Sequence, residues 1–254
     1  MTRPLVRRWP GWLAVALSAC GGAAPAARSP SPAVAAAPAP SAEAPATSEE
    51  TPPWEPVLDE DGVVVQRREV PGSSLIAFRG EGMVEQPLLR VAMVVLDATR
   101  SREWAARVVE ARELGARSPL EIVHYSRLAG SLVTSDREFV SAVTLDVVPG
   151  RQIRLRLRAT DDPRAPKGDA VRGEVHFGAF TLTADGDART RVEVELHADP
   201  KGSLPRWIVN LVQRRWAYKT IIALRKQAAR ADLVDVPRVR ERLTAAGFFG
   251  DAPR

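Results

Sequence analysis

The sequence has few of the residues that catalysis and metal binding need. Its 254 residues include one cysteine and three histidines. The single cysteine, Cys20, excludes an internal disulfide. The histidines, His124, His176 and His197, are far apart and lack the spacing of metal ligands. No nucleophile-elbow, zincin or phosphate-loop motif occurs. We therefore expect no catalytic residue, no metal site and no cofactor.

Long hydrophobic runs are also missing. The apolar run Trp12–Leu17 is much shorter than the about 20 residues that cross a bilayer. It follows a basic segment and precedes Leu17-Ser18-Ala19-Cys20, an order typical of a bacterial lipoprotein signal. The sequence thus predicts a signal peptide over residues 1–19 and acylation of Cys20, with palmitate among the attached chains. A secretory signal with a chance cysteine is the alternative.

The lipoprotein hypothesis predicts a location. Gly21 follows the cysteine, where an aspartate would favour the inner membrane, so we expect an envelope lipoprotein, with the outer membrane favoured, facing the periplasm or the cell exterior. Residues 20–52 are mostly alanine, proline, serine, glycine and threonine, which predicts a lipidated, disordered tether. Such a tether would span about 30 Å as a coil and up to about 100 Å when extended.

The basic charge of the chain has an ordinary origin. Of 36 Lys and Arg residues, three precede Cys20, which leaves 33 against 31 Asp and Glu. The densest basic cluster alternates with apolar residues and so predicts the solvent side of a half-buried strand. Binding to acidic headgroups is the alternative. No aromatic residues interleave with the cluster, so nucleic acid is not an expected partner. The cluster consists of Arg151, Arg154, Arg156 and Arg158.

The pattern of the remaining chain predicts one α+β domain over residues 53–232. Its apolar periodicity predicts two helices over residues 87–96 and 101–110, and a long terminal helix that starts at Ser203-Leu204-Pro205. A C-terminal tail over residues 233–254 contains a short helix that either docks on the domain or contacts a membrane. Strands are predicted over residues 63–70, 75–84, 120–128, 137–148, 152–160, 170–183 and 190–198.

Five segments of this domain carry a family resemblance. They are Trp54 with Asp61-Gly62-Val63, Leu96 to Trp104, Ser135 to Val140, Gly168 to Arg172, and Asp199 to Asn210. In this order they resemble the START domain, the lipid-transfer module related to steroidogenic acute regulatory protein. The resemblance implies a helix-grip fold, in which a curved antiparallel sheet wraps around a long C-terminal helix. It also implies an internal apolar cavity for one hydrophobic ligand.

Strand alternation and helical periodicity place ten side chains on inward faces, and the resemblance makes them candidate ligand contacts. Among them, His124 is a candidate contact, with an ordinary core histidine as the alternative. Arg215 lies on the apolar stripe of the terminal helix and is a candidate headgroup contact, with a snorkelling side chain as the alternative. The ten residues are His124, Phe139, Ser141, Val143, Leu155, Leu157, Ile208, Leu211, Arg215 and Tyr218.

Other positions that the family uses for ligand recognition reduce the number of expected ligand classes. Sterol carriers of the family place an inward acid near His124 and an arginine near Val143, a couple that this chain lacks. Phosphatidylcholine carriers place an arginine where this chain has Ser101. The loop over residues 161–169 is a candidate gate to the cavity. We expect Arg137 and Arg172 to form internal ion pairs or hydrogen bonds.

The sequence therefore predicts a monomeric, non-enzymatic lipid-binding or lipid-transfer protein, held at a membrane by its anchor. Its partner would be a lipid or another hydrophobic small molecule. A cyclase-like enzyme of the same helix-grip group is one alternative. A ligand sensor or scaffold that catalyses nothing is another.

Overall fold

The structure is a computed structural model that describes residues 52–130 and 134–250. Cys20, the predicted signal peptide and the predicted tether up to residue 51 lie outside these residues. The chain divides into two units, residues 1–47 and residues 48–254, and the fold described below belongs to the second. No helix in the described part of the chain is long and apolar enough to cross a membrane.

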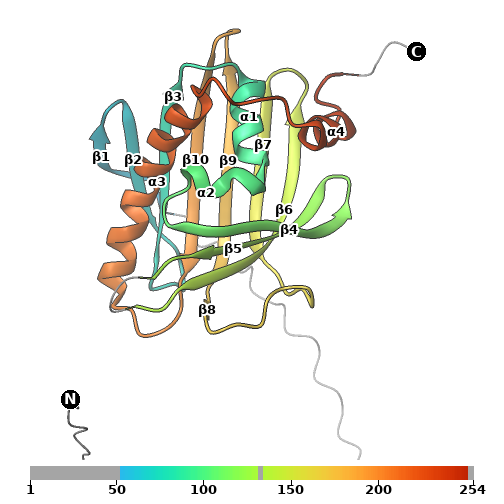
Figure 1. The fold of residues 1–254 in the computed structure, drawn as a ribbon. Helices are drawn as coiled ribbons and strands as arrows, with labels where there is room; N and C mark the ends of the chain where they lie inside the picture. Colours follow the sequence, from blue (N-terminus) through green and yellow to red (C-terminus); the bar gives the residue numbers. More distant parts are fainter. Residues whose placement is uncertain (1–51, 131–133, 251–254) are drawn as a thin grey trace, which may run out of the picture. The chain divides into compact units, whose positions relative to one another are not determined.

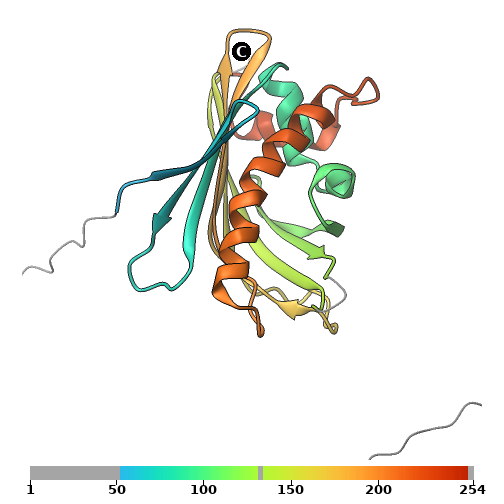
Figure 2. The same cartoon turned by 90° about the vertical axis from the view of Figure 1, so that its left-hand side faces the viewer.

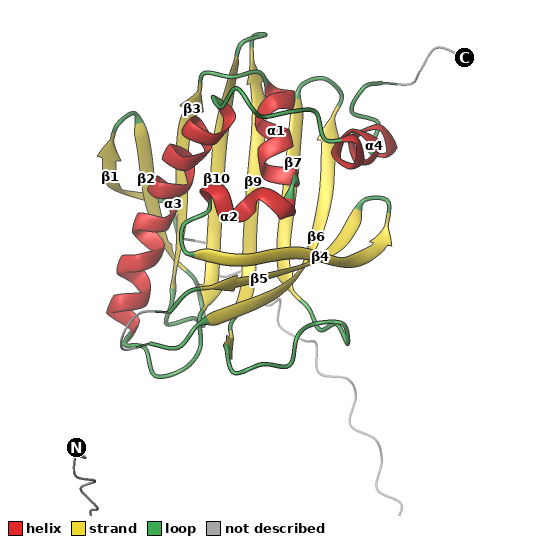
Figure 3. Cartoon of the chain, viewed as in Figure 1, coloured by secondary structure: helices red, strands yellow, loops and turns green. Residues whose placement is uncertain are grey.

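The second unit is built on one large, curved sheet (Figures 1 and 3). Its strands run in the order β1-β2-β3-β10-β9-β7-β6-β5-β4, all antiparallel, and β8 pairs in parallel with β6. The strands are β1 Glu55–Glu60, β2 Val63–Glu69, β3 Ile76–Val84, β4 Val108–Ser118, β5 Glu121–Leu128, β6 Arg137–Val148, β7 Gln152–Ala159, β8 Val171–Arg172, β9 Glu174–Asp185 and β10 Arg189–Asp199.

Helices cover one side of this sheet, and the end formed by β4 and β5 curves round on the same side (Figure 2). A short 3-10 turn, Ala98–Arg100, links the first two helices. The α+β class and the wrapping of a sheet around a long terminal helix are confirmed. The helices are α1 Leu88–Leu96, α2 Ser101–Trp104, α3 Arg206–Ala228 and α4 Pro237–Ala245.

Alternation along the strands follows the sequence closely in the middle of the sheet. In β7, Ile153 and Leu155 are buried, whereas Arg154 and Arg156 point to solvent. Arg156 forms an ion pair with Asp146 of the neighbouring strand at 2.7 Å. The arginine cluster is therefore the solvated side of a half-buried strand, as predicted.

The expected helix over residues 101–110 is wrong in its second half. Helix α2 ends at Trp104. Arg107 adopts a left-handed conformation with φ of 66°, which a helix does not tolerate. Strand β4 starts immediately afterwards, at Val108. The structure also adds β1, which sequence periodicity did not indicate, and divides the strand expected over 170–183 into β8 and β9 at Gly173.

The C-terminal half of α3 packs directly on the sheet. Ala217, Ile221 and Leu224 are fully buried. Gly80 and Gly82 of β3 make this close approach possible, because an added Cβ at either would lie 3.0 Å from an α3 side-chain atom. Arg225, one turn after Ile221, donates hydrogen bonds to three backbone carbonyls. Two belong to the β1–β2 turn, Asp61 O (2.6 Å) and Gly62 O (3.1 Å), and one belongs to β3, Met83 O (2.7 Å).

The C-terminal tail docks on the domain. Val239 and Leu243 of α4, together with Phe248, are buried in the main hydrophobic core. The backbone N–H of Gly150 donates to the carbonyl of Phe248 at 2.9 Å, which ties the tail to the β6–β7 turn. Of the two roles that the sequence left open for this tail, the structure shows docking.

Candidate functional site

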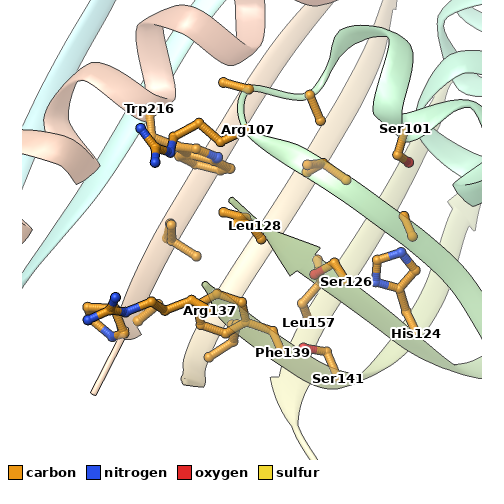
Figure 4. Close-up of a pocket in the computed structure, with 18 of the residues that line it drawn as sticks. Ser101, Arg107, His124, Ser126, Leu128, Arg137, Phe139, Ser141, Leu157 and Trp216 are labelled. Carbon is orange, nitrogen blue, oxygen red and sulfur yellow. The ribbon is translucent and has the colours of Figure 1, made fainter. Parts of the chain in front are cut away.

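A cavity of about 490 Å³ lies between the sheet and the N-terminal half of α3. Its wall is mainly apolar and comes from the α1–α2 segment, from strands β4 to β7, β9 and β10, and from α3. Figure 4 shows part of this wall, with Phe139, Leu128 and Leu157 around the open space. Seven of the ten predicted contact residues line it: His124, Phe139, Ser141, Val143, Leu155, Leu157 and Ile208.

The other three predicted contacts, all on α3, do not line the cavity. Leu211 is 47% exposed. Arg215 points outward and pairs with Glu60 at 3.0 Å. The hydroxyl of Tyr218 donates to the Asp61 carboxylate at 2.5 Å, so both side chains hold the β1–β2 turn rather than a ligand. The expectation that these three side chains line the cavity is wrong.

The error has a physical cause in the composition of α3. Its buried face includes the polar side chains of Gln213, Thr220 and Gln227, so the apolar residues do not mark the inward face. Gln213 becomes buried because its amide donates to the Ala198 carbonyl at 2.6 Å. Gln227 donates to the Glu103 carboxylate at 2.8 Å. A pattern of apolar residues alone cannot identify a face whose polar members find partners in the fold.

Helix α3 contributes a different set of residues to the cavity than the sequence predicted. Val209, Val212, Gln213 and Trp216 line it together with Ile208. The Trp216 ring meets Phe180 of β9 edge to face, with a centroid distance of 6.2 Å. Val212 is 58% exposed although it lines the cavity, so the cavity opens beside this part of α3.

Three polar residues form one row across the sheet, and two of them, His124 and Ser141, line the cavity. Glu113 of β4, His124 of β5 and Ser141 of β6 are direct partners in the antiparallel register. Opposed residues project from the same face, which here is the cavity face. Burial lowers the pKa of His124 below its usual value, and the nearby Glu113 opposes part of that shift. The imidazole is therefore neutral near pH 7 and offers one donor and one acceptor.

Helix α4 adds a charged pair beside this row. Arg242 lines the cavity, and its two terminal nitrogens bind the two Glu113 carboxylate oxygens at 3.2 and 3.0 Å. Both side chains are largely buried, at 15% and 23% exposure. The sequence did not predict this pair. Glu113 lies on β4, a strand that was not predicted, and Arg242 lies in the C-terminal tail, for which two roles were left open. No local signal marks it.

Two further arginines line another part of the wall, Arg107 and Arg137 (Figure 4). Arg107 donates to the Ala129 carbonyl at 2.8 and 2.6 Å. Arg137 donates to the Ser135 carbonyl, and its buried Nε finds no acceptor in the described ranges. Arg137 is thus a hydrogen-bond anchor, whereas Arg172 forms the expected ion pair, with Glu138 at 2.7 Å.

The candidate gate over residues 161–169 is not at the cavity. None of these residues belongs to its lining. Ala165 packs with Val123, Tyr125 and Val140, which project from the sheet face opposite to His124. The loop therefore covers the outer face of the sheet, and the gate hypothesis for it is wrong.

Ser101, where the resemblance implies a phosphate-binding arginine in phosphatidylcholine carriers, lines the cavity. Neither flanking arginine replaces it. Arg100 points away and pairs with Glu103 at 2.6 Å and Asp232 at 3.1 Å. Arg102 is exposed and is not part of the lining.

A curved antiparallel sheet that wraps around a long helix over an apolar cavity defines the helix-grip fold. The model of the START domain matches residues 43–228, and the chain belongs to the START domain family. Helix α4 lies beyond the matched residues.

Relatives share the fold at moderate identity. The crystal structure of a STAR-related lipid transfer protein fragment from Xanthomonas axonopodis is 30% identical, with a TM-score of 0.62, over 70% of this chain and 99% of that one. Human StAR-related lipid transfer protein 5 is 21% identical, with a TM-score of 0.66, over 71% and 88%. The phosphatidylcholine transfer protein of Bos taurus is 25% identical over 65% of this chain and 77% of its own length.

Proposed function

We propose that this chain is a lipid carrier of the bacterial cell envelope, which holds one hydrophobic molecule in the cavity under α3. The observation that carries the proposal is the cavity itself, about 490 Å³ of space with a mainly apolar wall. Its relatives include lipid transfer proteins, which supports the same class of cargo.

Such a carrier needs no chemical step. Each 100 Å² of apolar ligand surface removed from water contributes about 2.5 kcal/mol of binding free energy before the costs of association. Among residues 52–130 and 134–250, the cavity lining has one imidazole and three guanidinium groups but no carboxylate. It therefore lacks an acid and base pair aimed at a common point, which favours carriage over the cyclase-like alternative. One chain supplies the whole wall, so we propose a monomer.

Ligand exchange would occur where α3 borders the opening. Trp207 and Val212 are 68% and 58% exposed, and Leu211 is 47% exposed. All three lie in the first two turns of α3, beside the exposed Arg206. Tryptophan favours the interface between water and lipid, and arginine favours anionic headgroups. We propose that this end of α3 contacts the membrane during transfer.

The anchor completes the proposal. Acylation of Cys20 would hold the chain at a membrane, since two or more acyl chains bind a bilayer stably. The tether would let the domain reach lipid away from its own anchor. The outer membrane, on the periplasmic or external side, is the proposed location. Replacement of Cys20 by serine should move the chain from the membrane fraction to the soluble fraction; retention at the membrane would contradict the anchor.

Native mass spectrometry of the full-length Cys20→Ser chain, followed by lipid extraction, tests the carrier. We expect one co-purifying or added lipid per chain, released on denaturation. Ala111→Phe, which places a ring in the cavity, is the matched variant and should lose that mass. A folded chain that neither retains nor takes up any lipid would contradict the proposal and favour a scaffold, and turnover of the bound molecule would favour an enzyme.

A further inference from the structure

The polar end of the cavity has hydrogen-bonding groups with no protein partner. The side chains of His124, Ser126 and Ser141 all line the cavity. No residue in the described part of the chain hydrogen-bonds to any of the three, and none of their polar atoms is sealed from the cavity space. Figure 4 shows the three side chains close together on neighbouring strands. These groups are therefore available to a bound molecule.

A second uncharged group lies on α3. Gln213 is 6% exposed and lines the cavity. Its amide nitrogen is used by the Ala198 carbonyl, but its Oε1 is buried without a partner within residues 52–130 and 134–250. A buried acceptor left unpaired costs about 1–3 kcal/mol. This oxygen is itself sealed from the cavity space, so Gln213 adds no exposed hydrogen-bonding group to the polar end.

The charges at this end cancel. Arg242 uses both terminal nitrogens on Glu113, in a bidentate pair that leaves no net charge. An anionic headgroup placed against Arg242 would also face the Glu113 carboxylate, and it would have to break a largely buried pair. A cationic group placed against Glu113 would likewise face the Arg242 guanidinium and would have to break the same pair. Charged ligand groups are therefore disfavoured at this wall.

We infer that the inner wall formed by His124, Ser141 and Arg242, whose charge Glu113 neutralises, binds an uncharged oxygen group, a hydroxyl or a carbonyl, of an otherwise apolar cargo. This inference rests on the proposed carrier function and adds its ligand class. A hydroxyl donates and accepts at once, which matches a neutral imidazole and a serine. Helix α4, outside the matched family region, supplies Arg242 and so completes the subsite.

Four ligands with the same alkyl chain test the inference: 1-dodecanol, dodecane, dodecanoate and dodecyl phosphate. Binding of each ligand is measured by its displacement of the neutral fluorophore N-phenyl-1-naphthylamine from the full-length Cys20→Ser chain at pH 8. We expect 1-dodecanol to bind at least tenfold more tightly than each of the other three. Tighter binding of dodecyl phosphate would overturn the inference and point to Arg107 and Arg137. Equal binding of all four would overturn it as well.

A change of charge at the wall gives a gain-of-function test. Glu113→Gln leaves Arg242 without its carboxylate, so affinity for dodecanoate should rise at least tenfold relative to 1-dodecanol. Asp235→Asn is the matched control, because it frees Arg240 of the same helix from an exposed pair at 2.7 Å, neither member of which lines the cavity. The control should keep the wild-type ratio.

The outcomes separate the two proposals. Failure of all four ligands to displace the fluorophore would contradict the carrier function itself. Binding of dodecane and 1-dodecanol with equal affinity would leave the carrier intact but remove the polar subsite. A folded Glu113→Gln chain with an unchanged ratio of dodecanoate to 1-dodecanol affinity would show that the ligand does not contact this wall.

Discussion

The two halves of α3 cover the same sheet in opposite ways. The C-terminal half lies directly on β3, where Gly80 and Gly82 remove the side chains that would hold it off. The N-terminal half, from Ile208 to Trp216, faces about 490 Å³ of open space instead. The close packing of the C-terminal half fixes the helix. The N-terminal half contacts the sheet through side chains such as Gln213, which donates to the Ala198 carbonyl at 2.6 Å, and leaves the cavity beside them. A hollow domain can thus be stable because its filled part is packed at close range.

A bulky side chain at the filled half should break this arrangement. Gly82→Val would bring a Cβ to 3.0 Å from Ile221 and 3.2 Å from the Gly62 carbonyl. Overpacking of this kind costs about 3 kcal/mol. The melting temperature should fall by roughly 6–12 °C. Thermal unfolding followed by circular dichroism measures it.

Gly168→Ala is the control for this substitution, because nothing lies within 4 Å of its added Cβ. Its melting temperature should stay within about 2 °C of the wild-type value. If the melting temperature of Gly82→Val equalled that of Gly168→Ala, close packing of α3 on β3 would not be what holds the helix in place.

The second test concerns the polar contact at the filled end. Arg225→Met removes the donor to three backbone carbonyls, those of Asp61, Gly62 and Met83. The bond to Met83 is partly buried and the other two are exposed, so we expect their combined loss to destabilise the fold by about 2 kcal/mol. Urea unfolding gives the free energy directly. Lys226→Met, at the exposed neighbouring position, should change it by less than about 0.5 kcal/mol, and equal effects of the two variants would refute the assigned role of Arg225.

A bulky side chain beside the N-terminal half of α3 should reduce ligand binding rather than stability. Ala111 lines the cavity on β4, so Ala111→Phe would place its ring in open space rather than in packed atoms. We expect stability to change by less than about 1 kcal/mol. Affinity for 1-dodecanol should fall tenfold or more, which corresponds to about 1.4 kcal/mol. A large loss of stability with intact binding would mean that this space is not a ligand cavity.

The comparison also shows which features the sequence could predict. Strands β6 and β7 alternate regularly, so their inward residues were predicted correctly, Val143 and Leu155 among them. Strand β4 was not predicted, because it lies at the edge of the sheet and shifts register three times along β5. Each shift interrupts the two-residue period on which strand prediction depends.

The Glu113–Arg242 pair beside the inner wall escaped prediction for a related reason. Glu113 lies on the strand that was missed, and Arg242 lies 129 positions further along the chain. Nothing in either local sequence indicates a partner. Likewise, the cavity face of α3 contains Gln213, whose burial depends on a carbonyl of β10. Contacts made by tertiary structure alone have no periodic signal in the sequence.

Arg215 gives the smallest effect and the sharpest contrast with Arg225 on the same helix. Its exposed pair with Glu60, both side chains at 44% exposure, should contribute less than about 0.5 kcal/mol to stability. Because Arg215 faces away from the cavity, Arg215→Met should leave 1-dodecanol affinity unchanged within about twofold. Urea unfolding and fluorophore displacement measure the two quantities on one protein sample. A tenfold loss of affinity would instead indicate that Arg215 contacts the ligand. Because the side chain points away from the cavity, such contact would require α3 to rotate when the ligand binds.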